Sequence, residues 1–298
     1  MNISDVDSEV RTFTTRINYL LPGSFINRRF VAPGEEVNTG TYEPYSVMIR
    51  DGRSIKDHFN LDEHGFVLAD HRSRITDFFD KQQVDTVYPE EVVAVIRQLT
   101  GADRVAPLGW MVRTSGDLSK FQHQTVGYTH KGGVQPPAGE AHVDMTPGRA
   151  ENMARGIYDN FFPDGEPYRR FIASSLWRVF SPGPQDWPLA LCEGCSVGPE
   201  EGTPNTMFIV DRLPDRETML GEMPDEDKAM AADIFHYSPG HRWWYFSNMN
   251  RDEVLMFKFY DSDHSKAWRV PHTAFHDTSM AGTVTRESIE FRTVAYFL

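Results

Sequence analysis

Short apolar runs separated by turn residues dominate the second half of the chain. From about Phe171 the runs are rich in aromatic and β-branched residues, and clusters of Ser, Pro and Gly at 181–184 and 238–240 separate them. Six strands are predicted here: residues 172–180, 206–210, 233–237, 242–246, 254–260 and 288–297. Many short strands with few helices predict a mainly β fold, a sandwich or a jelly-roll barrel.

Three further elements are predicted upstream of these strands. Residues 89–99 predict a helix, because Pro begins the segment, apolar residues share one face and Gly101 follows its end. Residues 104–113 predict a strand, and a second helix is expected after Pro147. Four large apolar residues mark the face of that second helix: Met153, Ile157, Phe161 and Phe162. Residues 1–88 give only weak indications of strands and loops.

Length, composition and charge limit the kinds of molecule that the protein is expected to bind. With 298 residues, no internal repeat and no composition break, residues 1–298 are predicted to form a single domain. The net charge of -13 argues against nucleic acid and anionic membranes as partners, because their phosphates would be repelled. The acidic residues 1–7 do not resemble a signal peptide, and no apolar stretch is long enough to span a membrane. We therefore expect a soluble, cytoplasmic protein that acts on a small molecule.

The two cysteines form a Cys-x-x-Cys pair, Cys192 and Cys195. A zinc site would need a second pair of ligands at a suitable spacing, and redox activity would need a thioredoxin-like context. Neither is visible in the sequence. We interpret both residues as small side chains near the end of a strand.

The candidate chemistry begins at His142 and Asp144. In an extended segment, side chains two positions apart project to the same face, so this imidazole and this carboxylate can reach one ion. Two His and one carboxylate on one face of a metal are the ligand set of non-heme iron(II) oxygenases. The spacing alone is weak evidence, since roughly one such pair is expected by chance in a chain of this composition. A third ligand is required from elsewhere.

Five downstream histidines are candidates for the third ligand: His236, His241, His264, His272 and His276. A 2-oxoglutarate oxygenase also needs a cation for the far carboxylate of its cosubstrate, and Arg is the best geometric match. His272 is followed by Arg286 and Ser288, which share one face of the last predicted strand. His241 competes through Arg251, but residues 251–253 resemble a turn, where Arg251 would point to solvent. The sequence favours His272.

Six segments resemble the AsaB- and CmcJ-like hydroxylase/desaturase family of secondary metabolism, a branch of the iron(II)- and 2-oxoglutarate-dependent oxygenases. The matching segments are residues 61–66, 188–192, 241–246, 257–262, 271–275 and 286–292. The resemblance implies a double-stranded β-helix, that is a cupin-like jelly roll with flanking helices. It also implies Fe(II) at His142, Asp144 and His272, with 2-oxoglutarate as cosubstrate. Val143 and Met145 replace the family's usual Asn and Tyr, so we expect a changed substrate side of the pocket.

These observations predict a dioxygenase that uses dioxygen to oxidise an unactivated carbon of a small-molecule secondary metabolite. Hydroxylation, desaturation, cyclisation and peroxidation remain open as outcomes. The rival hypotheses are an iron oxidase that does not use 2-oxoglutarate and a metal-free jelly-roll binding protein. Arg178 either lines the pocket or lies on the surface, and the aromatics 243–245 favour core packing over pocket walls. The resemblance and the aromatic and Met content suggest a homodimer.

Overall fold

The structure of the chain is a computed structural model. It describes residues 10–32, 35–121, 131–226, 229–276 and 280–298, so the acidic segment 1–7 lies outside the described residues. None of the helices in these ranges is long and apolar enough to cross a membrane.

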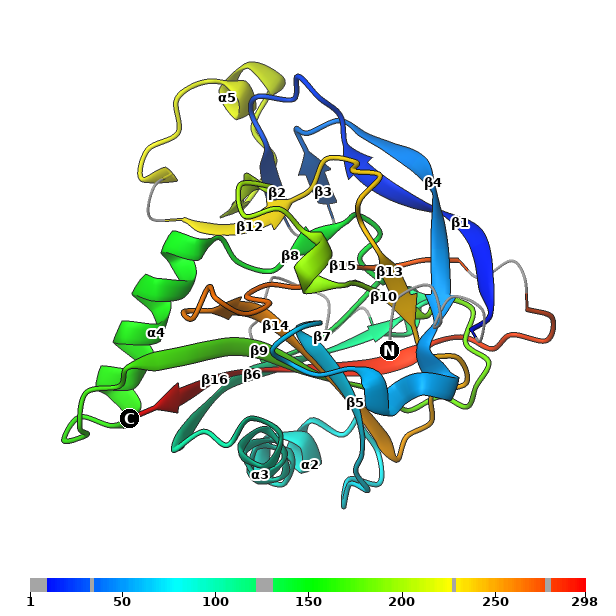
Figure 1. Cartoon of the computed structure of the whole chain (residues 1–298). Coiled ribbons are helices and arrows are strands. Elements are labelled where there is room, and N and C mark those ends of the chain that lie inside the picture. The colour runs from blue at the N-terminus through cyan, green and yellow to red at the C-terminus, as the bar shows by residue number, and fades with distance from the viewer. Residues whose placement is uncertain (1–9, 33–34, 122–130, 227–228, 277–279) are drawn as a thin grey trace.

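Two β-sheets form the body of the protein (Figure 1). The larger sheet has ten strands in the order β1 (Thr12–Leu20), β4 (Tyr42–Asp51), β13 (Trp243–Tyr245), β10 (Leu189–Cys192), β15 (His272–Ala274), β8 (His142–Val143), β12 (Met230–Ile234), β11 (Thr203–Ile209), β2 (Arg28–Ala32) and β3 (Glu35–Asn38). The smaller has six in the order β5 (Phe66–Asp70), β14 (Glu253–Asp261), β9 (Arg170–Val179), β16 (Glu287–Phe297), β6 (Arg104–Thr114) and β7 (Lys131–Gln135). This architecture confirms the predicted mainly β fold class.

Helices flank the sheets and leave the space between them to side chains. The helical elements are the 3-10 segments η1 (Gly52–His58), η2 (Leu118–Phe121) and η3 (Gly194–Ser196), and the helices α2 (Lys81–Thr86), α3 (Tyr88–Thr100), α4 (Pro147–Phe161) and α5 (Arg216–Leu220). Helix α3 covers the outer face of the six-stranded sheet, where its Val92 and Ile96 join a buried cluster with Ile289 and Phe291 of β16. A second buried cluster fills the space between the two sheets. The functional residues lie along this inner space.

The strongest local signals of the sequence match the observed elements. The helix predicted at 89–99 is α3, and Gly101 ends it with a φ of 70°, a left-handed value that suits glycine. The strand predicted at 104–113 is β6, and the helix predicted after Pro147 is α4. The six strands predicted in the second half correspond to β9, β11, β12, β13, β14 and β16.

Arg178 requires a correction, because neither of its two predicted positions is right. It lies on β9 with its side chain fully buried on the α3 side of the sheet, facing away from the inner space. Its guanidinium donates to Tyr88 Oη at 3.1 Å and to the carbonyl of His71 at 2.9 Å. Successive residues on a strand face opposite sides, so Trp177 faces the inner space while Arg178 ties the sheet to α3.

The aromatic and cysteine interpretations agree with the structure. Residues 243–245 are buried in the core between the sheets, as favoured from the sequence. Cys192 is buried at the end of β10 and Cys195 is exposed, and both are free thiols.

Candidate metal and cosubstrate site

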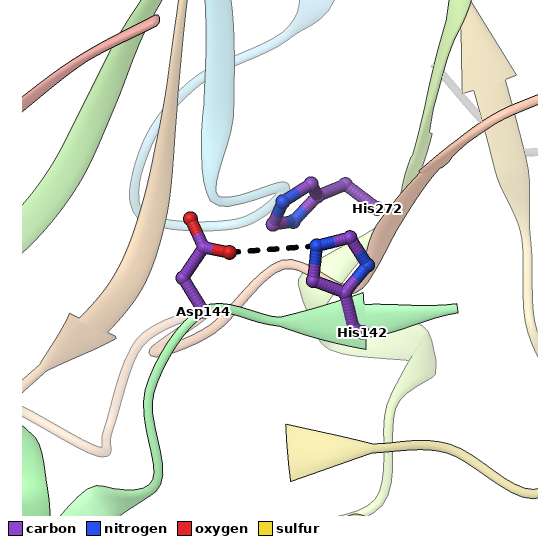
Figure 2. Close-up of side chains that lie close together, drawn as sticks. All are labelled: His142, Asp144 and His272. Carbon is purple, nitrogen blue, oxygen red and sulfur yellow. Dashed lines mark ion pairs between the residues drawn. The ribbon is translucent and has the colours of Figure 1, made fainter. Parts of the chain in front are cut away.

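Strand pairing brings two of the predicted metal ligands together. The short strand β8 carries His142 and lies beside β15, where His142 is directly opposite His272. The two imidazole centroids are 4.4 Å apart. Asp144 follows β8 by one residue, and Figure 2 shows its carboxylate turned toward the two rings. The predicted triad is therefore assembled by the register of the larger sheet.

The three side chains offer one ligand atom each, and these atoms lie within 4.8 Å of one another. His142 Nδ1 donates to the carbonyl of Glu140 at 2.8 Å, and His272 Nδ1 donates to the carbonyl of Val270 at 3.1 Å. A carbonyl only accepts, so each Nδ1 carries a proton and each Nε2 is the ring atom that can bind a metal. His142 Nε2 lies 3.4 Å from Asp144 Oδ1. Two imidazole nitrogens and one carboxylate fit a divalent iron.

Burial controls the charges of this cluster. Together with the neighbouring His142 it lowers the pKa of His272 to about 3, so the ring is neutral at ordinary pH. Burial alone would raise the pKa of Asp144, but the guanidinium of Arg292 and the hydrogen bond from His142 hold it well below its usual range. Arg292 Nη2 lies 3.0 Å from Asp144 Oδ2. Asp144 is therefore an anion, the state that binds a metal.

Arg286 and Ser288 present buried polar atoms to the same region. Arg286 is 1% exposed, and its Nη1 donates to the carbonyl of Trp187 at 2.9 Å. Its Nε has no hydrogen-bond partner in the part of the chain that the structure describes. Ser288 Oγ is also buried, and none of the described residues forms a hydrogen bond with it. Buried polar atoms of this kind are rare in folded proteins and call for an explanation such as a ligand.

A small cavity connects Arg286 with the two histidines. His142, His272, Arg286 and Trp177 all contribute to its lining. Burial and the neighbouring Arg113 lower the pKa of Arg286 to about 9, and the charges of Asp186 and Glu290 offset only part of this effect. A buried cation without a paired anion is the feature that a dicarboxylate such as 2-oxoglutarate would satisfy.

The competing histidines make other contacts. His241 is hydrogen-bonded through Nδ1 to Tyr19 and through Nε2 to Glu201, at 3.1 and 2.6 Å. His236 Nδ1 donates to a backbone carbonyl at 2.8 Å. The rings of His264 and His276 stack on tryptophans. Within the described ranges, the structure brings only His142, Asp144 and His272 together as a candidate metal site.

Two residues of the site were not singled out from the sequence. Glu290 accepts a hydrogen bond from Arg292 Nε at 2.7 Å and lies 3.8 Å from Arg113. It borders both the cosubstrate cavity and a larger cleft of about 730 Å³ that begins at Asp144 and Arg292. Alternation along β16 could have placed Glu290 on the face of Ser288, whereas nothing local indicated Arg113.

Comparisons with known proteins support the same interpretation. The family described as "Oxidoreductase/YMDC permease-like domain" matches residues 17–296. The chain is 29% identical to the hydroxylase/desaturase efuI of Hormonema carpetanum, over 96% of this chain and 95% of that protein. It is 30% identical to the hydroxylase/desaturase CTB9 of Cercospora beticola, over 78% of this chain and 71% of that protein. It is 27% identical to the Fe(II)/2-oxoglutarate-dependent dioxygenase nvfI of Aspergillus novofumigatus, over 89% of this chain and 87% of that protein.

A solved structure extends the comparison to the fold. The iron and alpha-ketoglutarate-dependent endoperoxidase NvfI superposes with a TM-score of 0.75 at 23% identity, covering 96% of this chain and 97% of that chain. At this identity the likeness shows the fold alone, and it confirms the predicted jelly roll.

Proposed function

The chain belongs to the hydroxylase/desaturase family of iron(II)- and 2-oxoglutarate-dependent oxygenases, and on this premise we propose which residues perform its chemistry. His142, Asp144 and His272 hold the iron, and Arg286 and Ser288 bind 2-oxoglutarate. The assignment rests on one observation: three metal-ligand atoms lie within 4.8 Å of one another beside a cavity lined by the buried Arg286. Among the described residues this arginine forms no salt bridge. The enzyme uses iron(II), 2-oxoglutarate and dioxygen, which argues against both rival functions.

Each proposed residue has a physical role that the structure supports. The Nδ1 hydrogen bonds of His142 and His272 fix the tautomer and the ring orientation, so that both Nε2 atoms face the metal position. Asp144 supplies the negative charge. Arg286 offers the donor edge that contains Nε, and Ser288 offers a hydroxyl from the same strand face, so both contact the carboxylate remote from the metal.

The reaction that follows is the oxidation of an unactivated carbon of a small-molecule secondary metabolite. Bound iron supplies the activation of dioxygen, with 2-oxoglutarate as the source of the two further electrons. The protein itself positions the cosubstrate and the substrate and keeps water away from them. The cosubstrate lies in the inner cavity, and the substrate enters through the cleft that reaches Asp144 from the other side.

Succinate release tests this proposal without knowledge of the substrate. Protein reconstituted with Fe(II) and 2-oxoglutarate in air should release succinate slowly, and His142→Ala should abolish this release. The matched control is His236→Ala, because His236 is bonded to the backbone away from the cluster. Equal succinate release by wild type and His142→Ala would reject the ligand assignment.

A further inference from the structure

The cleft beyond the candidate iron site has the size of a small-molecule site. Its volume is about 730 Å³, within the ~300 to 1,000 Å³ typical of ligand pockets. Asp144, Glu290 and Arg292 form its inner end, so it is continuous with the metal cluster. Helix α4 forms one wall of the cleft, and in Figure 1 this helix stands beside the sheets at the end nearer the C-terminus.

Helix α4 presents two different faces. Ala150, Ala154 and Tyr158 are buried in the core between the sheets. Met153, Ile157 and Phe161 lie at four-residue intervals, share another face and line the cleft. Three of the four apolar residues that the sequence predicted for this helix therefore line the cleft, and Met153 and Ile157 also pack against the core. Phe162, the fourth, packs against the core alone.

Polarity changes along the cleft. The N-terminal end of α4 lies next to Asp144, and the polar lining residues Arg149 and Asn152 belong to this end. Twelve residues separate Arg149 from Phe161, which corresponds to roughly 18 Å along a helix. At the far end Phe161 is 43% exposed, which is unusual for a large apolar side chain in a wall of a cavity. Along α4, the lining thus changes from polar residues at the N-terminal end to apolar residues at the C-terminal end.

The two arginines that line the cleft differ in the salt bridges and hydrogen bonds that they form with the protein. Arg292 is paired with Asp144 and with Glu290. Arg149 makes one hydrogen bond among the described residues, a long one of 3.5 Å to the carbonyl of Glu226. The carboxylate of Glu226 is itself paired with Arg28 at 2.6 Å. Arg149 therefore keeps most of its donor capacity for a ligand in the cleft.

We propose, building on the function proposed above, that the substrate is an acidic amphiphile. Its anionic head group binds Arg149 beside the iron site, and its apolar body lies along Met153, Ile157 and Phe161. A carboxylate can bind a guanidinium through two parallel hydrogen bonds. An apolar ligand body would also remove the exposed apolar surface of the helix from water, which favours binding. The carbon that is oxidised consequently lies near the polar end of the substrate.

Binding of model amphiphiles tests this proposal directly. Decanoate and decylammonium share the same apolar chain and carry opposite charges, and acetate has the head group without the chain. Calorimetric titration into the full-length protein loaded with Mn(II) and 2-oxoglutarate should show decanoate binding at least about tenfold tighter than decylammonium, and no measurable binding of acetate. Equal affinity for the two amphiphiles would overturn the proposed charge preference.

Variants of helix α4 distinguish decanoate binding in the cleft from adsorption of decanoate to the protein surface. Arg149→Gln should weaken decanoate about tenfold to a hundredfold, because a charge-assisted pair is lost, and Arg149→Lys should fall in between. Ile157→Asp should reduce binding below detection. Arg155→Gln, an exposed arginine of α4 outside the cleft lining, is the control and should bind as wild type does. If Arg155→Gln weakens decanoate as much as Arg149→Gln, decanoate is adsorbed at the surface and the proposal fails.

The design distinguishes this failure from failure of the proposed function. Mn(II) and 2-oxoglutarate are titrated separately into the same variants, which should bind both normally. If the metal and 2-oxoglutarate bind but decanoate does not, the ligand class is wrong and the enzyme assignment stands. If decanoate binds through Arg149 while neither Mn(II) nor 2-oxoglutarate binds, the iron and cosubstrate assignments are wrong.

Discussion

The assignment of Arg286 to 2-oxoglutarate is the prediction with the sharpest quantitative consequence. Two substitutions separate charge from geometry. Arg286→Lys keeps a positive charge but loses the planar pair of donors, whereas Arg286→Met keeps an unbranched apolar chain and loses charge and donors together. Arg286 does not belong to the proposed metal cluster, so iron binding should be retained in both variants.

The magnitude follows from the contacts that a ligand would make. Arg286 is almost fully buried and uses Nη1 for the carbonyl of Trp187, which leaves the edge that contains Nε. A charge-assisted hydrogen bond contributes about 1.5 to 3 kcal/mol, and every 1.4 kcal/mol corresponds to a factor of ten. Arg286→Met should therefore raise the Kd for 2-oxoglutarate roughly tenfold to several hundredfold. Arg286→Lys should lie between this variant and wild type.

Calorimetric titration of 2-oxoglutarate into the Mn(II)-loaded protein measures these constants. Affinity for the metal and for decanoate should change much less than affinity for 2-oxoglutarate. The reasoning is refuted if Arg286→Met binds 2-oxoglutarate as wild type does. Loss of binding in Arg292→Met instead would identify Arg292 as the cosubstrate arginine. If neither substitution changes the affinity, these arginines do not hold the cosubstrate carboxylate.

Four further outcomes are expected. His272→Ala should abolish both Mn(II) binding and succinate release, while the matched His264→Ala should retain both, and full activity of His272→Ala would remove it from the metal shell. Mn(II) at a hundredfold excess over its Kd should raise the free energy of unfolding in urea by about 2.7 kcal/mol, and an unchanged midpoint would contradict a preformed site. Gly101→Ala should lower the free energy of unfolding by about 1 to 2 kcal/mol, because φ is 70° at this position. Gly156→Ala should raise it by about 0.5 to 1 kcal/mol, because Gly156 lies inside helix α4. Changes of the same sign in the two variants would contradict this reasoning. Light scattering should show a homodimer, and a strict monomer would count against it.

Local signals explain which elements could be predicted from the sequence. Helix α3 has Pro at its start, an apolar face and a glycine after its end, and each of these acts within a few residues. The first 88 residues lack such signals. Strand β1 alternates exposed and half-buried residues over most of its length, and it is held by its pairing with β4 about thirty positions away. Nonlocal pairing of this kind leaves little trace in a short window of sequence.

The metal site shows the same division between local and nonlocal information. The shared face of His142 and Asp144 follows from strand periodicity, which operates over two residues. The position of His272 opposite His142 follows from the register of β8 and β15, which joins residues 130 positions apart in the chain. The sequence could favour His272 only indirectly, through Arg286 and Ser288 downstream and through the family resemblance. The register that brings the rings together became visible in the structure.

Arg292 depends on both local periodicity and a nonlocal contact, and it explains why the site can exist before the metal binds. Periodicity along β16 places it on the face of Ser288, but its partner, the Oδ2 atom of Asp144 at 3.0 Å, comes from a different sheet. A buried carboxylate without a countercharge would destabilise the fold by several kcal/mol. Arg292 supplies that countercharge and is itself held by Glu290, so the metal-free protein is not destabilised in this way. Metal binding should therefore add stability to an already folded chain, and loss of the metal should leave the jelly roll intact.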